Sequence, residues 1–160
     1  MPSKSLDDLN DALAHDNVKA FLRAIRLGEG TTDPDGYRRI VGGQLFTDFS
    51  WHPKVRVWIE RYKVWSTAAG AYQITIKTWS GLVNQYGFKD FMPKTQDLAA
   101  VALIVEKGAL DDIMEGRIRA AIRLCSPLWA SLPNSEAGQR RESLEAVLAE
   151  YQKHGGDIQA

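Results

Sequence analysis

Cysteine is almost absent from this 160-residue chain, in which Cys125 is the only one. A single cysteine excludes an intramolecular disulfide and any metal site built from several cysteine ligands. Cys125 ends a segment with apolar residues at helical spacing, so we expect it to be a small core residue. Histidine is also scarce, and His52 and His154 lack partners at metal-ligand spacing. The sequence therefore predicts no metal site and no cofactor.

Excess charge of one sign is also missing, because 20 Lys and Arg residues balance 20 Asp and Glu residues. A formal net charge of zero gives no overall attraction to nucleic acid or to an anionic membrane surface. No apolar run approaches the length that spans a bilayer, and residues 1–8 lack the basic start and apolar stretch of a signal peptide. We therefore expect no nucleic-acid partner, no stable membrane association and no signal peptide.

The composition is otherwise that of a folded protein, with 44% hydrophobic and 25% charged residues. A chain of this length buries a substantial core without disulfide or metal staples. No repeat, low-complexity block or linker rich in proline, glycine and serine divides it. We predict one domain over residues 1–160, monomeric by default, in which residues 1–16 form an N-terminal helical extension.

Helical periodicity covers most of the chain. Apolar residues recur at intervals of three and four in six segments: residues 6–15, 18–29, 72–86, 98–105, 113–124 and 136–154. Asp16 is the expected cap of the second segment, and Thr95 is the expected cap of the fourth. Gly87 and Gly108 are the expected stops of the third and fourth segments.

Residues 31–65 differ in character, since glycine, proline and aspartate cluster early and β-type patterns follow. Residues 39–46 predict a strand, a turn and a second strand, and residues 55–60 alternate apolar and polar side chains. A small β-lobe inserted after the first main helix gives an α+β fold. A cleft between a helical body and such a lobe is a common place for a ligand site.

Glu29 stands where the second helical segment ends, between two glycines. Its place on the apolar face of that segment directs the carboxyl toward an apolar wall. Desolvation and the negative end of the helix dipole both raise the pKa of a carboxyl, so Glu29 is a candidate general acid. The alternative is an exposed glutamate at a fraying helix end, followed by a glycine stop.

Nine short motifs occur in one order along the chain: residues 28–31, 36–37, 40–48, 52–53, 69–73, 87–91, 93–97, 108–110 and 125–133. Together they resemble the phage lambda endolysin family, over roughly residues 18–160. The resemblance implies a lysozyme-like fold and a lytic transglycosylase. Such an enzyme cuts the β-1,4 bond between N-acetylmuramic acid and N-acetylglucosamine in peptidoglycan, and its product carries a 1,6-anhydro ring.

The resemblance also implies roles for two residues. Glu29 matches the glutamate that protonates the glycosidic oxygen and then accepts the proton of the muramic acid 6-hydroxyl. Because that hydroxyl attacks within the substrate, no second carboxylate is required. Residues 70–73 resemble a Gly-x-Tyr-Gln segment that lies across the cleft from the acid. Gln73 is therefore expected to orient the substrate, with Tyr72 packing beneath it or touching sugar.

Further candidates for substrate contact come from the same region. Tyr37 follows a turn glycine and is expected to line the cleft or to pack within the β-lobe. Asp48 is expected to support the cleft through hydrogen bonds. Three tryptophans in the β-rich region are candidates to meet the glycan: Trp51, Trp58 and Trp65. Trp51 is included among the substrate-binding candidates, whereas Trp79 and Trp129 are expected in the core.

The chain departs from the lambda pattern at three places near the cleft. The stretch over residues 29–36 is shorter, Arg38 stands where an acidic residue is expected, and Ala71 replaces an arginine. These changes leave Glu29 and Gln73 in place, so they bear on substrate preference and rate more than on the type of reaction.

Two other functions remain open from the sequence. One is a hydrolytic lysozyme of the same fold, in which Asp35 or Asp48 activates water, although Asp33 and Asp35 fall in a turn-rich run that favours a local role. The other is a non-catalytic glycan-binding module. The resemblance implies peptidoglycan strands as the partner and accumulation in the host cytoplasm. Action in the periplasm would then follow holin-dependent release.

Overall fold

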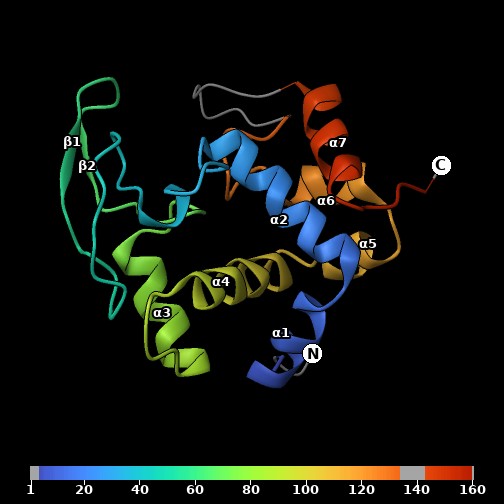
Figure 1. Ribbon diagram of the computed structural model, residues 1–160, viewed down its shortest axis with the longest axis horizontal. Helices are drawn as coiled ribbons and strands as arrows, with labels where there is room; N and C mark the ends of the chain where they lie inside the picture. The colour runs from blue at the N-terminus through green and yellow to red at the C-terminus, as the bar shows by residue number, and fades with distance from the viewer. Residues whose placement is uncertain (1–3, 134–142, 160) are drawn as a thin grey trace.

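The computed structural model describes residues 4–133 and 143–159. Figure 1 shows helices grouped into a body, with a two-stranded hairpin at one edge. The elements in chain order are α1 (Leu6–Leu13), α2 (Asp16–Glu29), a 3₁₀ turn (Gly36–Arg38), β1 (Val57–Ile59), β2 (Val64–Ser66), α3 (Ile76–Tyr86), α4 (Pro93–Glu106), α5 (Leu110–Met114), α6 (Ile118–Cys125) and α7 (Leu144–Lys153). No helix in these two ranges is both long and apolar enough to cross a membrane.

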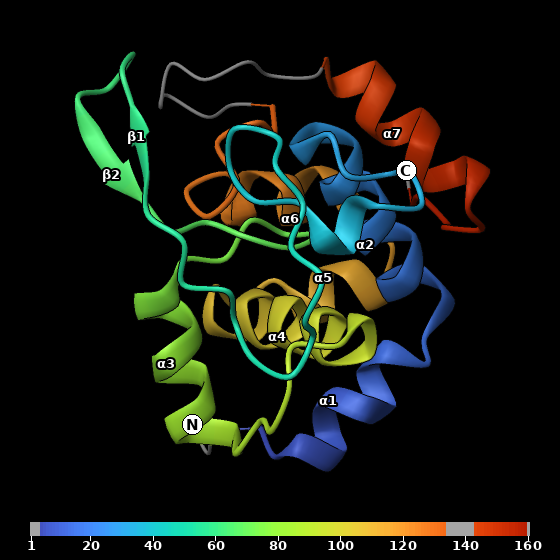
Figure 2. The ribbon, with the colours of Figure 1, turned by 60° about the vertical axis from the view of Figure 1, so that its left-hand side comes forward.

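The helical body is built around α4 and α2. Residues 98–104 of α4 are buried without interruption, so this helix is apolar on every side. It contacts α1, α2, α3 and α5, as Figure 2 shows from a second direction. α2 is amphipathic instead, and its buried face packs against α7 and α5. α2 therefore crosses the body with its C-terminal end directed toward the loops that lead to the β-lobe (Figure 1).

The core contains the residues that the sequence placed there. Trp79 is fully buried and stacks on Phe88, and Trp129 is 3% exposed. Cys125 is fully buried as well, and burial raises the pKa of its thiol to about 12. A thiol in this state is not a nucleophile at neutral pH. These three predictions are confirmed.

Two of the predicted helix starts are wrong by a few residues. The imidazole Nδ1 of His15 accepts the backbone N–H of Asn17, so His15 caps α2 and Asp16 is its first residue. α4 begins at Pro93, because proline suits the first helical position, where no N–H is required. Thr95 therefore lies inside the helix, and its hydroxyl donates to Asp90.

Other helix boundaries depend on single residues. α3 begins after Thr75, which accepts the N–H of Thr78, and not at residue 72 as predicted. The predicted helix over residues 113–124 is two helices, which Gly116 separates with a φ of 80°. Gly87 and Gly108 end their helices with positive φ, as predicted. The first part of the predicted helix over residues 136–154 lies outside the described residues, and α7 accounts for the rest.

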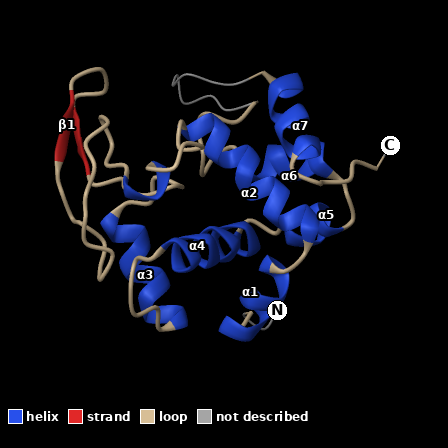
Figure 3. Ribbon diagram, viewed as in Figure 1, coloured by secondary structure: helices blue, strands red, loops and turns tan. Residues whose placement is uncertain are grey.

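The β-lobe has less regular structure than the sequence predicted (Figure 3). β1 and β2 pair antiparallel, with Trp58 opposite Trp65. Residues 39–46 form a tight turn with one bridge, between Arg39 and Leu45, in place of two strands. Ile40 pairs locally, because its N–H donates to the carbonyl of Gln44, and it also bridges Ala69. This long-range bridge attaches the lobe to the loop before α3.

Candidate active site

Glu29 is the last residue of α2, and its backbone environment explains the glycines on either side. Gly30 adopts a left-handed conformation with φ of 72°, which ends the helix. A Cβ on Gly28 would lie 2.6 Å from Oγ of Ser131, so only glycine permits this approach. The Ser131 hydroxyl donates to Oε1 of Glu29 at 3.3 Å.

The carboxyl of Glu29 is half-buried, and its pKa is raised to about 7. Burial is the main cause, because removal from water disfavours the charged form. The hydrogen bond from Ser131 acts in the opposite direction and lowers the pKa. The rise that the sequence predicted is thus present. A carboxyl with a pKa near neutrality can both give and accept a proton at that pH.

Residues 70–73 form a strained turn that presents Gln73. Gly70 has φ of 84°, and a Cβ there would lie 2.3 Å from Oε1 of Gln96. That same oxygen accepts the N–H of Ala71 at 2.9 Å. Gln73 itself has φ of 50°, which is unusual for a residue with a side chain. The side chain of Gln96 in α4 therefore holds this turn in its conformation.

The side-chain amide of Gln73 is oriented by two backbone carbonyls. Its Nε2 donates to the carbonyl of Arg39 at 3.0 Å and to that of Gly70 at 2.9 Å. Within the described residues, its Oε1 has no hydrogen-bond partner. An amide oxygen in this setting is available as an acceptor for a ligand hydroxyl or N–H.

Direct contacts join the end of α2 to this turn. The Thr31 hydroxyl donates to the carbonyl of Ala71 at 2.6 Å, and Nη1 of Arg39 donates to the carbonyl of Gly30 at 3.2 Å. Residues 129–131 contact both of these segments. The Ser131 hydroxyl donates to Glu29, and Nε1 of Trp129 donates to the carbonyl of Tyr72 at 3.0 Å. Three segments distant in sequence thus meet where Glu29 and Gln73 are held.

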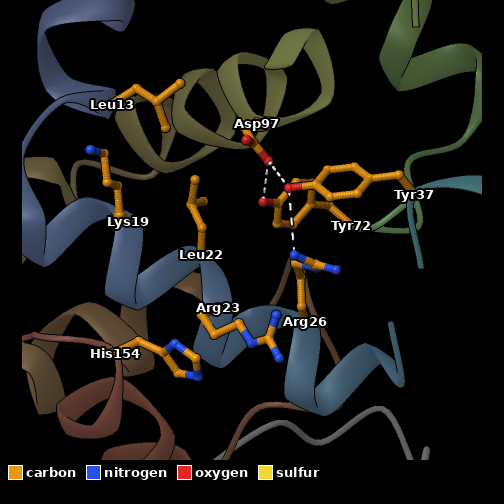
Figure 4. A pocket seen from close by; sticks show the side chains of 9 residues that line it. All are labelled: Leu13, Lys19, Leu22, Arg23, Arg26, Tyr37, Tyr72, Asp97 and His154. Atoms are coloured by element: carbon orange, nitrogen blue, oxygen red, sulfur yellow. Dashed lines mark hydrogen bonds between the residues drawn. The ribbon is translucent and has the colours of Figure 1, made fainter. Parts of the chain in front are cut away.

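Tyr37 and Tyr72 lie beside this meeting point and share one partner. Their hydroxyls donate to Oδ1 of Asp97 at 2.8 and 2.5 Å, as Figure 4 shows. Tyr72 is 2% exposed, so it offers no surface to a sugar, and of its two predicted roles the geometry fits packing. Tyr37 is half-buried and lines a cavity of about 220 Å³ with Arg26 and Asp97.

Asp48 and Trp51 occur together in a groove of about 530 Å³. The Asp48 carboxylate is exposed and accepts the N–H of Ser50, which lowers its pKa. Trp51 is half-buried and meets the edge of Trp79, with ring centroids 5.8 Å apart. Neither Glu29 nor Gln73 is among the residues that line this groove.

The remaining tryptophan candidates lie on the hairpin. Trp58 is 42% exposed and Trp65 is 56% exposed, and their rings meet edge to face. The guanidinium of Arg56 lies over the Trp65 ring at 4.7 Å. These flat faces are available to a ligand, although no contact among residues 4–133 and 143–159 joins them to Glu29.

The acids near the start of the lobe are engaged in ion pairs. Asp33 pairs with Arg39 at 2.9 Å, and Asp35 pairs with Arg38 at 3.2 Å. The carbonyl of Asp33 also accepts the N–H of Gly36, which fits the turn role predicted for this run. In the described part of the chain, no three His, Cys, Asp or Glu side chains gather as a metal site would require.

The family model described as Endolysin matches residues 19–158. The chain belongs to the endolysin family. The endolysin of Escherichia phage lambda is 43% identical over 146 residues, which cover 88% of this chain and 92% of that protein. The endolysin of Escherichia phage P2 is 41% identical over 157 residues, which cover 89% of this chain and 94% of that protein.

Solved structures confirm the lysozyme-like α+β fold of this endolysin. Bacteriophage lambda lysozyme complexed with a chitohexasaccharide matches with a TM-score of 0.84 and 42% identity, covering 90% of this chain and 97% of that one. A second structure of lysozyme from bacteriophage lambda matches with a TM-score of 0.81, 41% identity and the same coverage. α1 precedes the segment that the family model matches.

Sequence reasoning did not assign roles to several polar residues that shape this site: Arg39, Gln96, Asp97 and Ser131. Gln96 and Asp97 directly precede the apolar run of α4 over residues 98–105, which was the available signal. Ser131 falls within the motif over residues 125–133 but carries no local pattern of its own. Its contact with Glu29 spans more than a hundred residues, so only the folded chain reveals it.

Replacing Ser131 with alanine provides a test of how the pKa of Glu29 is set. The hydrogen bond from Ser131 stabilises the ionised carboxylate of Glu29, so its removal raises the pKa of Glu29 further. We expect the basic limb of the pH–activity profile to move upward by about 0.7 pH unit, since such a bond contributes about 1 kcal/mol. The profile is measured as turbidity loss of purified sacculi. A limb that stays in place or moves downward would contradict this assignment.

Proposed function

We propose that this endolysin is a lytic transglycosylase of peptidoglycan, which forms 1,6-anhydro-N-acetylmuramic acid ends. The observation that carries the proposal is a single half-buried glutamate whose pKa of about 7 lies near the working pH. No second carboxylate is hydrogen-bonded to Glu29 or Gln73 within the described residues. A relative of the same fold was solved with a chitohexasaccharide, which supports a glycan ligand.

In the proposed reaction, protonated Glu29 donates its proton to the glycosidic oxygen as the bond from the muramic acid C1 to that oxygen breaks. The 6-hydroxyl of the same sugar attacks C1 and closes the anhydro ring, and its proton passes to the Glu29 carboxylate. The acid is thereby regenerated in one cycle. Attack within the substrate lowers the entropic part of the barrier, provided that the sugar is held in a reactive pucker.

The groups around Glu29 are proposed to position the substrate. We propose that Oε1 of Gln73 accepts a hydrogen bond from an N-acetyl N–H or a ring hydroxyl, because its Nε2 is already occupied. Asp48 and Trp51 are proposed to extend the sugar-binding surface along their groove, and Tyr37 to support the cleft from beneath. No metal or cofactor enters this scheme.

The biological setting is part of the same proposal. The endolysin accumulates in the host cytoplasm as a single-domain monomer and reaches the periplasm when a holin opens the inner membrane. There it acts on peptidoglycan glycan strands, without nucleic-acid partners or stable association with a membrane. The family identity of the chain supports this assignment.

Mass spectrometry of muropeptides released from Gram-negative sacculi tests the reaction type. We expect anhydro-muropeptides from the wild type and from Asp48→Asn, because Asp48 is hydrogen-bonded locally and has no part in the chemistry. Reducing ends in place of anhydro ends would overturn the transglycosylase and favour a hydrolytic lysozyme. Glycan binding without any product would favour a binding module.

A further inference from the structure

Asp97 is a half-buried acid of α4 that the proposed reaction does not use. Its Oδ1 accepts the hydroxyls of both Tyr37 and Tyr72, whose rings meet edge to face (Figure 4). Burial raises the pKa of Asp97, while the two phenols and the nearby Arg26 lower it. We refer to these four residues, Arg26, Tyr37, Tyr72 and Asp97, as the Asp97 cluster.

Arg26 connects this cluster to the end of α2. Its guanidinium lies 4.4 Å from the centroid of the Tyr37 ring, and its Nε and Nη2 donate to the carbonyl of Thr31 at 3.0 and 2.6 Å. Thr31 is fully buried, and its hydroxyl donates to the carbonyl of Ala71. Contacts therefore run without a gap from α4 to the backbone just after Glu29 and to the turn before Gln73.

The energetics of the cluster favour a role in geometry over one in stability. A half-buried carboxylate loses hydration, and an apolar side chain in its place often gives equal or greater stability. Hydrogen bonds to a carboxylate are short and directional, so two of them fix the phenols more narrowly than apolar packing does. Tyr72 immediately precedes Gln73, whose positive φ persists only if its surroundings hold it.

We propose that Asp97 is a positioning residue, which acts through Tyr37 and Tyr72 to hold Gln73 and Glu29 at the separation that the reaction requires. This proposal rests on the proposed function, because it takes Glu29 as the acid and Gln73 as the amide that orients the substrate. Misplacement of reacting groups by about 1 Å can cost about a hundredfold in rate, so loss of the cluster is expected to reduce turnover.

The test compares Asp97→Asn and Tyr72→Phe with the wild type on soluble, uncrosslinked glycan strands. We expect kcat to fall about 10- to 100-fold in each variant, as misplacement of the reacting groups by up to about 1 Å would cause, with KM changed less than about twofold. The double variant should lose no more than the worse single variant, since both changes break the same contact. Asp112→Asn is the matched control, because Asp112 is also a half-buried acid and accepts a hydrogen bond from Arg117.

Several outcomes would overturn the proposal. A kcat within twofold of the wild type in folded Tyr72→Phe would do so, as would a loss confined to KM or an equal loss in Asp112→Asn. Circular dichroism at the assay temperature corrects each rate for the folded fraction. Should Asp97→Asn fail to fold, Tyr72→Phe decides alone, since it keeps the ring and deletes only the hydroxyl. The rate is measured from all released fragments, whatever the chemistry of their ends. Fragments with reducing ends would therefore refute the transglycosylase, but the effect of the Asp97 variants on kcat would still stand.

Discussion

Glu29→Gln is expected to lower the rate of peptidoglycan solubilisation by about 10³-fold, within the range of about 10²–10⁴ that general acid–base catalysis contributes. Glutamine keeps the shape of the side chain and can still contact Ser131, but it has no proton to give at the pH of the reaction. The loss should therefore appear in kcat, with binding of soluble glycan strands retained. Turbidity loss of sacculi and titration calorimetry measure the two quantities.

The same substitution should stabilise the protein at high pH. At pH values between 4.5, the ordinary pKa of glutamate, and about 7, the pKa of Glu29 in the folded protein, Glu29 is ionised in the unfolded chain but still protonated in the folded one. Stability of the wild type thus falls as the pH rises through this window, by about 2 kcal/mol after allowance for partial exposure. Glu29→Gln removes this loss, so its Tm should exceed that of the wild type at pH 8 by about 5 °C and equal it near pH 4.

Either of two results would contradict this account of Glu29. Retention of more than a tenth of the wild-type rate in Glu29→Gln would exclude it as the acid. Equal Tm values for the variant and the wild type at pH 8 would show that the carboxyl is not desolvated in the folded state. Glu60→Gln serves as a control, because Glu60 is exposed, lies on the hairpin and is hydrogen-bonded to Lys63.

Gly70→Ala is expected to destabilise the fold by about 3 kcal/mol and to abolish most activity. The positive φ alone costs about 1–2 kcal/mol in a residue with a Cβ. The new methyl group would also displace the side-chain carbonyl of Gln96, which holds the N–H of Ala71. The turn that carries Gln73 would then lose its support, so we expect a drop in Tm of about 10 °C.

Gly87→Ala is the matched control for this prediction. Gly87 has a φ of 74°, close to that of Gly70, but a Cβ there meets nothing within 4 Å. Gly87→Ala should therefore bear only the cost of a positive φ in a residue with a Cβ. We expect a loss of about 1 kcal/mol in the free energy of unfolding and of about 3 °C in Tm, with the specific activity of the folded protein unchanged. Equal effects of the two substitutions, measured by thermal unfolding, would show that the contact with Gln96 contributes nothing.

The main helices follow from local patterns because their signals are strong and consistent. Apolar spacing over α2 and α4 predicts buried helices, and the glycine after Glu29 supplies a stop that the structure uses. The same spacing directs Glu29 to a desolvated position, from which its raised pKa follows. The small lobe was predicted in the correct place but with too many strands in residues 39–46, where the local pairing is limited to one bridge, between Arg39 and Leu45.

Single hydrogen bonds, some local and some between distant segments, account for the helix boundaries that the sequence did not predict. The cap of α2 is His15 instead of Asp16, and residues 72–75 remain outside α3 because Ile74 pairs with Ala69 and Tyr72 reaches Asp97. Local propensity is nearly balanced at such positions, so a single hydrogen bond decides between the alternatives.

The sequence by itself determined the fold class and the buried core, since both depend on periodicity and on residues adjacent in the chain, and its family motifs singled out Glu29 as the candidate acid. Only the tertiary structure decided which groups surround that acid. Ser131 and the Asp97 cluster reach the site across long sequence separations, and no local pattern encodes such a contact. The pKa of Glu29 and its placement relative to Gln73 depend on these neighbours, because desolvation and hydrogen-bond geometry exist only once the chain has folded.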